Sequence, residues 1–193
     1  MPKRPTPETL ARFAAIVGEK GVIRDPQEQQ PYLEEWRNLW TGKTPLILRP
    51  ASTDEVSRIM ALASETETAI VPQSGNTGLV GGQIPNPDGS EVLLSLDRMT
   101  RILAVDAEDF SITVEAGATL ASVQAAAAEH DRLFPLSLAS EGSCRIGGNL
   151  GSNAGGVNVI AYGNARDLCL GLEVVLADGR VLSQLRALRK DNT

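Results

Sequence analysis

The stretch Pro72–Gly82 contains the residues whose types and spacing point most directly to chemistry. It reads Pro-Gln-Ser-Gly-Asn-Thr-Gly-Leu-Val-Gly-Gly and follows the short apolar run 69–71. Because glycine has no Cβ, the backbone of such a loop can approach a ligand closely, and successive N–H groups can converge on an anion. We therefore interpret the stretch as a loop that wraps a pyrophosphate. A polar surface turn is the alternative, since single glycine-rich motifs often match by chance.

A second glycine-rich stretch covers residues 142–156 and holds six glycines, two asparagines and two serines. Ordinary proteins contain roughly 7% glycine, so this is a dense local excess. Two such stretches in one small chain indicate a long ligand that is gripped from two sides.

Composition excludes several classes of protein. The formal net charge of −6 argues against nucleic acid, which needs a basic patch, but backbone amides could still hold a nucleotide. Apolar runs are too short for a membrane span, and no apolar stretch follows the basic N-terminus to suggest a signal peptide. Cys144 and Cys169 are too few for a disulfide scaffold or a zinc site, which favours a reduced, cytoplasmic setting. His130 is the only histidine and is interpreted as a structural residue at the end of a helix.

The elements that must position the first glycine-rich stretch form a strand–helix–strand unit over residues 45–71. The strand 45–50 is bounded by prolines, and Ser52 begins a helix with apolar residues on one face. The second strand, 68–71, leads directly into the glycines. We expect a right-handed crossover, with the loop at the carboxyl end of the strand, where open α/β sheets bind ligands.

Other elements follow from the same signals. Thr6 and Pro7 begin an N-terminal helix, and the polar segment 25–44 is interpreted as a covering segment, with a cleft edge as the alternative. The remaining expected elements are strands at 92–96, 102–105, 111–115 and 168–177, a helix from Thr119 to about Glu129, and a hairpin turn at Asp178-Gly179 that leads into 180–182.

Further motifs stand in a fixed order after the first loop. They are Phe134-Pro135, Gly142-Ser143-Cys144, Ile146-Gly147-Gly148-Asn149, Ser152–Gly156, Tyr162-Gly163, the run Leu-Gly-Leu-Glu-Val-Val-Leu-Ala-Asp-Gly at 170–179, and the closing Leu-Arg-Lys-Asp-Asn-Thr at 188–193. Together they resemble the FAD-binding domain of the vanillyl-alcohol-oxidase-type flavoproteins, the PCMH-type fold. The D-lactate and D-2-hydroxyglutarate dehydrogenase branch of these FAD-linked oxidases is the nearest. The resemblance covers about residues 20–193.

The resemblance implies an α+β fold made of two α/β-type subdomains with mixed sheets, and FAD in the crevice between them. It divides the chain into an N-terminal helical segment, 1–40, and an FAD-binding domain, 41–193. The first subdomain would cover about 41–105 and the second about 106–193, incomplete at its C-terminus. The family's substrate-binding cap domain is absent, so we expect the chain to be an N-terminal piece of a longer protein.

Carried over position by position, the resemblance also implies a set of cofactor-binding residues. The first loop would wrap the pyrophosphate and ribose, and the later motifs would line the far side of the cofactor and the flavin. These residues are Pro72, Gln73, Ser74, Gly75, Asn76, Thr77, Gly78, Leu79, Val80, Pro135, Gly142, Ser143, Cys144, Ile146, Gly147, Gly148, Gly151, Asn153, Ala154, Gly155, Tyr162 and Gly163. Some relatives carry a histidine that bonds to the flavin where this chain has Thr77, so non-covalent FAD is expected.

The activity that the resemblance implies is oxidation of a D-2-hydroxy acid, such as D-lactate, D-2-hydroxyglutarate or glycolate, to the 2-oxo acid with hydride transfer to flavin N5. The electron acceptor would be a quinone, an electron-transfer flavoprotein or a cytochrome, and a homodimer is an open alternative to a monomer. The family's catalytic histidines, divalent-metal ligands and carboxylate-binding arginine lie in the absent part, so we assign no catalytic residue and no metal ligand here. Glu141 and Asp167 are interpreted as solvated or structural acids, and Arg37 as a weaker candidate for the substrate carboxylate.

Three alternatives remain beside the dehydrogenase. An oxidase that passes electrons to oxygen would share the same FAD domain. The chain could also be a cofactor-binding module that is inactive without its cap, or a phosphate-binding protein that holds no flavin.

Overall fold

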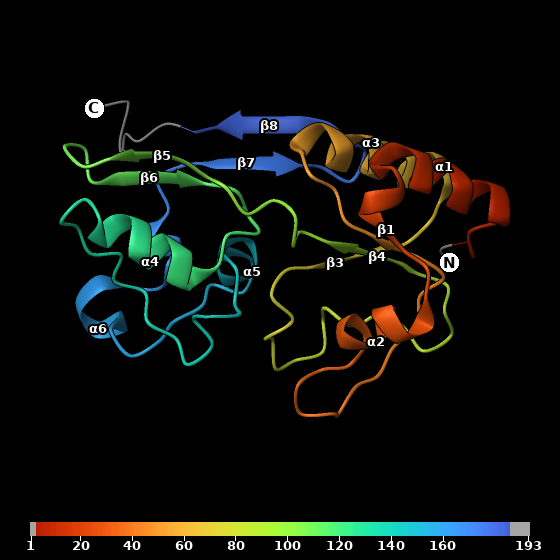
Figure 1. Ribbon diagram of the computed structural model, residues 1–193, viewed down its shortest axis with the longest axis horizontal. Coiled ribbons are helices and arrows are strands. Elements are labelled where there is room, and N and C mark those ends of the chain that lie inside the picture. Colours follow the sequence, from red (N-terminus) through yellow and green to blue (C-terminus); the bar gives the residue numbers. More distant parts are fainter. Residues whose placement is uncertain (1–2, 186–193) are drawn as a thin grey trace. The chain divides into compact units, whose positions relative to one another are not determined.

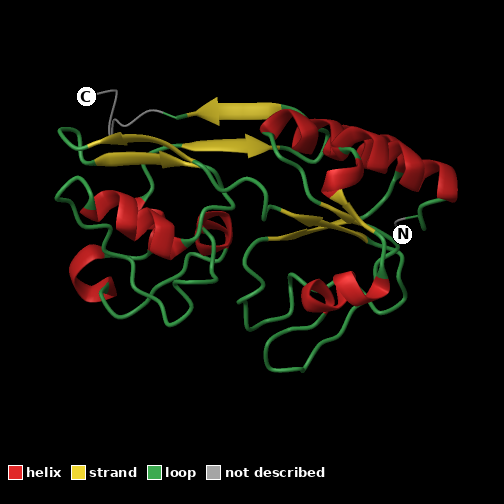
Figure 2. Ribbon diagram, in the orientation of Figure 1, coloured by secondary structure: helices red, strands yellow, loops and turns green. Residues whose placement is uncertain are grey.

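The structure, a computed structural model, describes residues 3–185 and mixes helices with small sheets (Figures 1 and 2). The chain divides into two compact units. The first unit runs to Met99 and includes Val175–Val181, while the second comprises Thr100–Val174 and continues from Leu182. The closing motif at 188–193 lies outside the described residues.

The first unit is built on a four-stranded sheet with the order β1-β2-β4-β3. Its strands are β1 (Val22–Ile23), β2 (Ile47–Leu48), β3 (Ile70–Gln73) and β4 (Val92–Ser95). β2 and β3 each pair in parallel with β4, and β1 pairs antiparallel with β2. The expected strand–helix–strand unit therefore forms, with β4 between its two strands.

Helices cover both faces of this sheet (Figure 1). α1 (Pro7–Val17) and α3 (Thr53–Thr66) lie on one face, where Phe13 and Ile59 are buried against Leu48. α2 (Pro26–Leu33) lies on the other face, where Tyr32 and Leu33 pack against the cluster of Ile23, Ile47 and Leu93. Neighbouring residues of a strand point to opposite faces, so Ile47 and Leu48 serve different cores.

The expected helix starts in this unit are confirmed by their capping hydrogen bonds. The Thr6 hydroxyl accepts from the Thr9 N–H at 3.1 Å, and the Ser52 hydroxyl accepts from the Glu55 N–H at 3.2 Å. α2 is a difference, because the sequence predicted only a polar covering segment there. The Asp25 carboxylate caps α2 by accepting from the Gln27 and Glu28 N–H groups. A one-turn 3-10 helix, Glu19–Gly21, joins α1 to β1.

The second unit begins with the antiparallel pair β5 (Ile102–Asp106) and β6 (Ser111–Val114), as expected. α4 (Leu120–Ala128) follows, capped by the Thr119 hydroxyl, which accepts from the Ser122 N–H at 3.2 Å. Shorter helices complete the unit, namely α5 (Ile146–Gly151), α6 (Val159–Tyr162) and the 3-10 helix Ala165–Leu168. Buried Leu120, Leu136, Cys144 and Ala165 form a hydrophobic cluster of this unit.

The strands β7 (Leu172–Val175) and β8 (Val181–Gln184) are joined by the expected turn at Asp178-Gly179. The Leu176 N–H donates to the Arg180 carbonyl at 2.8 Å, and Gly179 has a φ of +86°. β7 is shorter than the predicted strand 168–177 at both ends: Leu168 ends the preceding 3-10 helix, and Ala177 already belongs to the turn. Within residues 3–185, no helix combines the length and the hydropathy that crossing a membrane requires.

Candidate cofactor-binding site

The first glycine-rich loop leaves the sheet of the first unit at a defined edge. β3 and β2 both run parallel to β4, and Gln73 at the end of β3 is paired with Ser95 at the end of β4. The loop therefore begins where the carboxyl ends of parallel strands meet, and this is the edge at which open α/β sheets bind ligands.

Four consecutive backbone amides of this loop are free to bind a ligand. In the part of the chain that the structure describes, the N–H groups of Gly75, Asn76, Thr77 and Gly78 donate no hydrogen bond. Asn76 adopts a left-handed conformation with a φ of +52°, which bends the loop. Consecutive amides around a residue of this kind form a concavity that suits an anion such as a phosphate.

The Asn76 side chain adds a second binding feature. Its Nδ2 donates to the Pro31 carbonyl at 3.1 Å and to the Glu34 carbonyl at 2.9 Å. These two acceptors fix the orientation of the carboxamide, since the reverse orientation would face Oδ1 toward two carbonyl oxygens. Oδ1 is buried and has no hydrogen-bond partner among the described residues.

A buried acceptor without a partner costs about 1–3 kcal/mol, so Asn76 Oδ1 suits a ligand that brings a donor. The free amides of the same loop suit a ligand that brings an anion. A dinucleotide offers both, through its pyrophosphate and through its ribose hydroxyls or adenine amine. The residues present therefore fit FAD.

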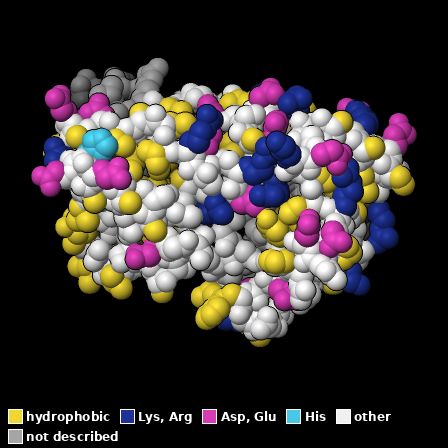
Figure 3. Space-filling view, in the orientation of Figure 1, with side chains coloured by type: hydrophobic (Ala, Val, Ile, Leu, Met, Phe, Trp, Pro, Cys, Tyr) yellow, Lys and Arg dark blue, Asp and Glu magenta, His cyan; other side chains and the backbone are white. Residues whose placement is uncertain are grey.

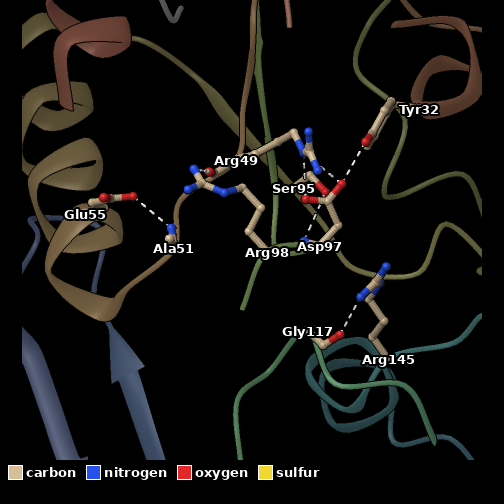
Figure 4. Close-up of polar contacts among 9 residues, drawn as sticks. All are labelled: Tyr32, Arg49, Ala51, Glu55, Ser95, Asp97, Arg98, Gly117 and Arg145. Carbon is tan, nitrogen blue, oxygen red and sulfur yellow. Dashed lines mark hydrogen bonds and ion pairs between the residues drawn. The ribbon is translucent and has the colours of Figure 1, made fainter. Parts of the chain in front are cut away.

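Charged groups lie at the same edge of the sheet, where Asp97 neutralises Arg49 and Arg98 bonds to a backbone carbonyl (Figure 4). Asp97, just after β4, accepts from Arg49 Nε at 2.8 Å and from the Tyr32 hydroxyl at 2.7 Å. Arg98 donates to the Arg49 carbonyl at 2.7 Å. Burial lowers the pKa of Arg49, but the hydrogen bond and charge of Asp97 outweigh it, so the pKa lies above its ordinary value. This network braces the ends of β2 and β4 beside the loop.

The second glycine-rich stretch differs from the predicted loop, because part of it forms α5. The Ile146 and Gly147 N–H groups donate to the carbonyls of Ala118 and Ala116 within the same unit, the latter at 2.7 Å. A Cβ added at Gly147 would lie 2.9 Å from the Ala116 Cβ, so glycine allows this short helix to approach the backbone at Ala116. Arg145, which precedes α5, donates to the Gly117 carbonyl (Figure 4).

Other glycines near this stretch are also required by packing. A Cβ at Gly156, whose φ is +106°, would meet the Ser137 carbonyl at 2.1 Å, and one at Gly163 would meet the Asp167 side chain at 2.6 Å. Gly142 and Gly151 have no such neighbour within 4 Å among the described residues. The glycine excess of this stretch therefore serves close packing at several positions, whereas packing does not explain Gly142 and Gly151.

The structure also places four other predicted residues in or near the second stretch. Cys144 is buried in the hydrophobic cluster, so any contact that it makes with a ligand would come from its backbone. The Asn153 carbonyl oxygen Oδ1 accepts from the Arg166 N–H, and the Pro135 carbonyl accepts from Asn158 Nδ2. Tyr162 is about half exposed. The cofactor-binding roles of these residues stay predictions.

The two acids considered near these loops have structural partners. The Asp167 carboxylate accepts from the Asn164 N–H at 2.8 Å and forms a capping box with it. Glu141 accepts from Gln124 Nε2 at 3.3 Å. The structure also shows a residue that sequence reasoning missed, the fully buried Glu35 next to the first loop. It lies in the polar segment 25–44, where nothing in the spacing of residues signals burial.

Comparison with known proteins gives the family. Residues 44–184 match the family model described as FAD binding domain, and the chain belongs to this family. FAD is therefore the cofactor of the domain. Curated relatives include the mitochondrial D-2-hydroxyglutarate dehydrogenases of Danio rerio, 42% identical over 190 residues, and of Bos taurus, 43% identical over 186 residues. These matches cover 98% and 96% of this chain but only 35% and 34% of the relatives, so the chain spans about a third of their length.

Solved structures confirm the fold that the sequence predicted. Alkyldihydroxyacetonephosphate synthase superimposes with a TM-score of 0.84 at 21% identity, over 95% of this chain and 35% of that one. p-Cresol methylhydroxylase gives a TM-score of 0.71 at 22% identity, over 94% of this chain and 36% of that one. The chain thus has the PCMH-type fold of helices and mixed, open sheets.

The expected cytoplasmic setting is contradicted by these relatives, which are named as mitochondrial proteins. The expectation rested on the low number of cysteines, which indicates only that thiols stay reduced. That criterion does not separate the cytoplasm from other reducing compartments.

Proposed function

We propose that the complete protein is an FAD-dependent dehydrogenase that oxidises a D-2-hydroxy acid to the 2-oxo acid, with D-2-hydroxyglutarate and D-lactate as the first substrates to test. The observation that carries the proposal is the identity of about 42% with D-2-hydroxyglutarate dehydrogenases across almost the whole of this chain. The same relatives favour a mitochondrial setting. A quinone, an electron-transfer flavoprotein or a cytochrome would take the electrons.

This chain would contribute the binding of the cofactor. FAD would supply N5 as the acceptor for the hydride from C2 of the substrate, and this chain's residues would hold and orient the cofactor. The free amides of Gly75–Gly78 would hold the pyrophosphate, and Asn76 Oδ1 would accept a hydrogen bond from a hydroxyl or amine of the nucleotide. The later residues, from Pro135 to Gly163, would contact the rest of the cofactor. Thr77 cannot form the bond that a histidine makes to the flavin, so the cofactor would be held non-covalently.

The continuous part of the first unit ends at Met99, near the expected boundary between the subdomains 41–105 and 106–193, which supports this division, whereas Val175–Val181 also belong to the first unit and depart from it. The segment 1–40 packs onto the first of these through α1 and α2. We retain this division as a proposal.

The test uses the full-length protein. Its visible absorption is recorded before and after precipitation with acid, and it is then mixed with D-2-hydroxyglutarate or D-lactate and an artificial electron acceptor. We expect flavin bands that appear in the acid supernatant and bleaching of these bands by one of the D-acids but not by its L-isomer. Flavin retained in the pellet would refute non-covalent binding, and absence of flavin after FAD is added would refute the cofactor assignment.

Two alternatives predict different results in the same experiment. An oxidase would consume oxygen during turnover without an added acceptor. A domain that serves only to bind the cofactor would show the flavin bands but no bleaching with any 2-hydroxy acid.

A further inference from the structure

The C-terminal end of α2 and the residues that follow it hold the first glycine-rich loop at several points. Gln73 Nε2 donates to the Tyr32 carbonyl at 2.8 Å and to the Gln83 carbonyl at 3.1 Å, which fixes the start of the loop and brings its end close. Asn76 donates to the Pro31 and Glu34 carbonyls, which fixes its middle. One end of the loop and its centre are thus tied to the C-terminal end of α2.

A buried carboxylate lies in the centre of this contact. The Glu35 side chain is completely buried, and it accepts from Arg37 Nε at 2.9 Å and from the Leu39 N–H at 3.3 Å. Burial raises the pKa of Glu35, but the hydrogen bonds and charge of Arg37 and the Leu39 amide outweigh it, so the pKa lies below its ordinary value. The carboxylate is therefore ionised at neutral pH and needs its arginine, since an unpaired buried charge is strongly unfavourable.

Arg37 connects this carboxylate to the glycine-rich loop. While its Nε donates to Glu35, its Nη2 donates to the Leu79 carbonyl. The guanidinium also lies 5.8 Å from the centre of the Trp40 ring, and a Cβ added at Gly81 would lie 2.8 Å from that ring. The loop thus meets the segment 35–40 at both Leu79 and Gly81.

This arrangement gives Arg37 a different role from binding a substrate carboxylate. Its charge is balanced by Glu35, and its planar guanidinium group donates both to the Glu35 carboxylate and to the Leu79 carbonyl. Lysine could balance the charge but could not supply both donors in this fixed geometry.

From these contacts we propose that Glu35 and Arg37 are positioning residues that hold the glycine-rich loop in the conformation that presents its free amides to the cofactor. The inference rests on the proposed binding of FAD by this loop. A loop with four glycines between 75 and 82 has many accessible conformations, and ordering it on binding would reduce affinity. The Glu35–Arg37 pair removes part of that loss by tying the loop at Leu79 before the cofactor arrives.

The chain offers a direct probe of this contact, because Trp36 and Trp40 are its only tryptophans. Both are exposed in part, beside exposed Leu39, Leu79 and Val80. In Figure 3 hydrophobic side chains gather at the lower edge of the view, where the loops after α2 and β3 reach down in Figure 1. A Trp36→Phe substitution leaves Trp40 as the one tryptophan of these 193 residues, so a change in quenching between two proteins that differ only at Arg37 reports on the contact of Trp40 with the loop.

The experiment compares full-length Trp36→Phe protein with the same protein carrying Arg37→Lys. We measure the FAD dissociation constant by fluorescence titration, the quenching of Trp40 by acrylamide without FAD, and the melting temperature. We expect Arg37→Lys to raise the dissociation constant about fivefold to tenfold, in line with the loss of one ordinary hydrogen bond. Quenching of Trp40 should increase, and the melting temperature should change little because Glu35 keeps a cationic partner.

Arg12→Lys is the matched control, because Arg12 pairs with Glu65 at the surface of the same unit, at 2.9 and 3.1 Å. It should leave the dissociation constant and the quenching unchanged. A double variant, Glu35→Gln with Arg37→Met, removes the pair without leaving a buried charge and should weaken FAD binding at least as much as Arg37→Lys.

The outcomes separate this inference from the proposed function. If the Trp36→Phe reference does not bind FAD, the proposed function fails. If the reference binds FAD and Arg37→Lys binds it equally well with unchanged quenching, the positioning role is wrong. The positioning role would also be wrong if Arg37→Lys and Arg12→Lys lowered the melting temperature equally and neither changed the affinity for FAD.

Discussion

Asn76 combines two properties that few residues offer together. Asparagine tolerates the left-handed backbone, and its carboxamide donates to two carbonyls while keeping an acceptor for a ligand. We expect Asn76→Asp, which keeps the shape, to lose both donated bonds and to place a negative charge beside the pyrophosphate. FAD affinity should fall about tenfold to a hundredfold, given about 1 kcal/mol for each hydrogen bond and added repulsion.

The measurement is a fluorescence titration of apo-protein with FAD. Asn86→Asp is the control, because Asn86 also lies in a loop of the first unit but bonds to Glu91 and not to the glycine-rich loop. Equal affinities of Asn76→Asp and the unmodified protein would contradict the role given to Asn76.

Glu115 is the residue whose charge links stability to pH. It accepts from the side chain and the N–H of Arg101, at distances from 2.7 to 3.0 Å. Burial raises the pKa of Glu115, but the bonds and charge of Arg101 outweigh it, so the pKa lies below the ordinary value of 4.5. The carboxylate therefore stabilises the folded state above pH 4.5, and this contribution disappears as the pH falls through the lower folded pKa.

Glu115→Gln should be less stable than the unmodified protein at pH 7 and should lose less stability on acidification below pH 4.5. Urea unfolding at a series of pH values measures both effects. Glu65→Gln, which removes a carboxylate paired with Arg12 at the surface, is the control. If Glu115→Gln and the unmodified protein show parallel curves, the assigned role of Glu115 is incorrect.

At the scale of elements, α5 shows how a glycine can let a helix pack closely against a neighbouring segment. Gly147 and Gly151 belong to the same short helix, but only Gly147 faces a close neighbour, Ala116. Gly147→Ala should destabilise the protein by about 1–3 kcal/mol through overpacking. Gly151→Ala should be neutral or stabilising by up to about 1 kcal/mol, because alanine is the better helix former.

Thermal or urea unfolding of the two variants measures this contrast, with each variant as the control of the other. Equal effects would show that helix propensity decides at both positions and that the contact with Ala116 is unimportant.

Local signals in the sequence predicted those elements that carry their own boundaries. Thr6, Ser52 and Thr119 were identified as helix caps and are confirmed as such. α2 was missed, although Asp25 and Pro26 carry the same cap signal, because its residues are mostly polar and show no apolar face. α5 was missed because glycine argues against a helix, and only its packing against Ala116 explains why one forms.

The candidate site has two parts, the glycine-rich loop and the residues that support it, and only the loop could be predicted from the sequence. The glycine-rich loop follows a buried strand, so its place at the sheet edge could be predicted from the sequence. The support from Glu35 and Arg37 could not, because it depends on a segment 42 residues away from Leu79 and on burial that the polar sequence conceals.

At the scale of the whole molecule, the turn at Gly179 joins α3 in the first unit. The Ser57 hydroxyl donates to the Gly179 carbonyl at 2.6 Å, and a Cβ added at Gly179 would meet the Ser57 carbonyl at 2.6 Å. Gly179→Ala should therefore cost about 2–4 kcal/mol, from a positive φ and from the clash together. Gly89→Ala shares the positive φ, but its Cβ would lie 3.7 Å from the nearest neighbour, so it should cost only about 1–2 kcal/mol.

Urea unfolding measures the free energy of unfolding of both variants. Because both carry alanine at a positive φ, the difference between their losses of stability gives the cost of the contact between the turn and α3. If Gly179→Ala and Gly89→Ala lost the same free energy of unfolding, α3 and the turn would accommodate the added Cβ without strain.

The same contact has a consequence for how the protein is made. Ser57 and Gly179 are 122 residues apart, so a ribosome that adds about 5–20 residues each second needs roughly 6–24 s to deliver the partner of α3. During that interval the surface of α3 around Ser57 and Ala61 is uncovered in the nascent chain. Most of the first unit is thus synthesised before the second and yet is completed only when the turn emerges, so this face of α3 stays open to other contacts during translation.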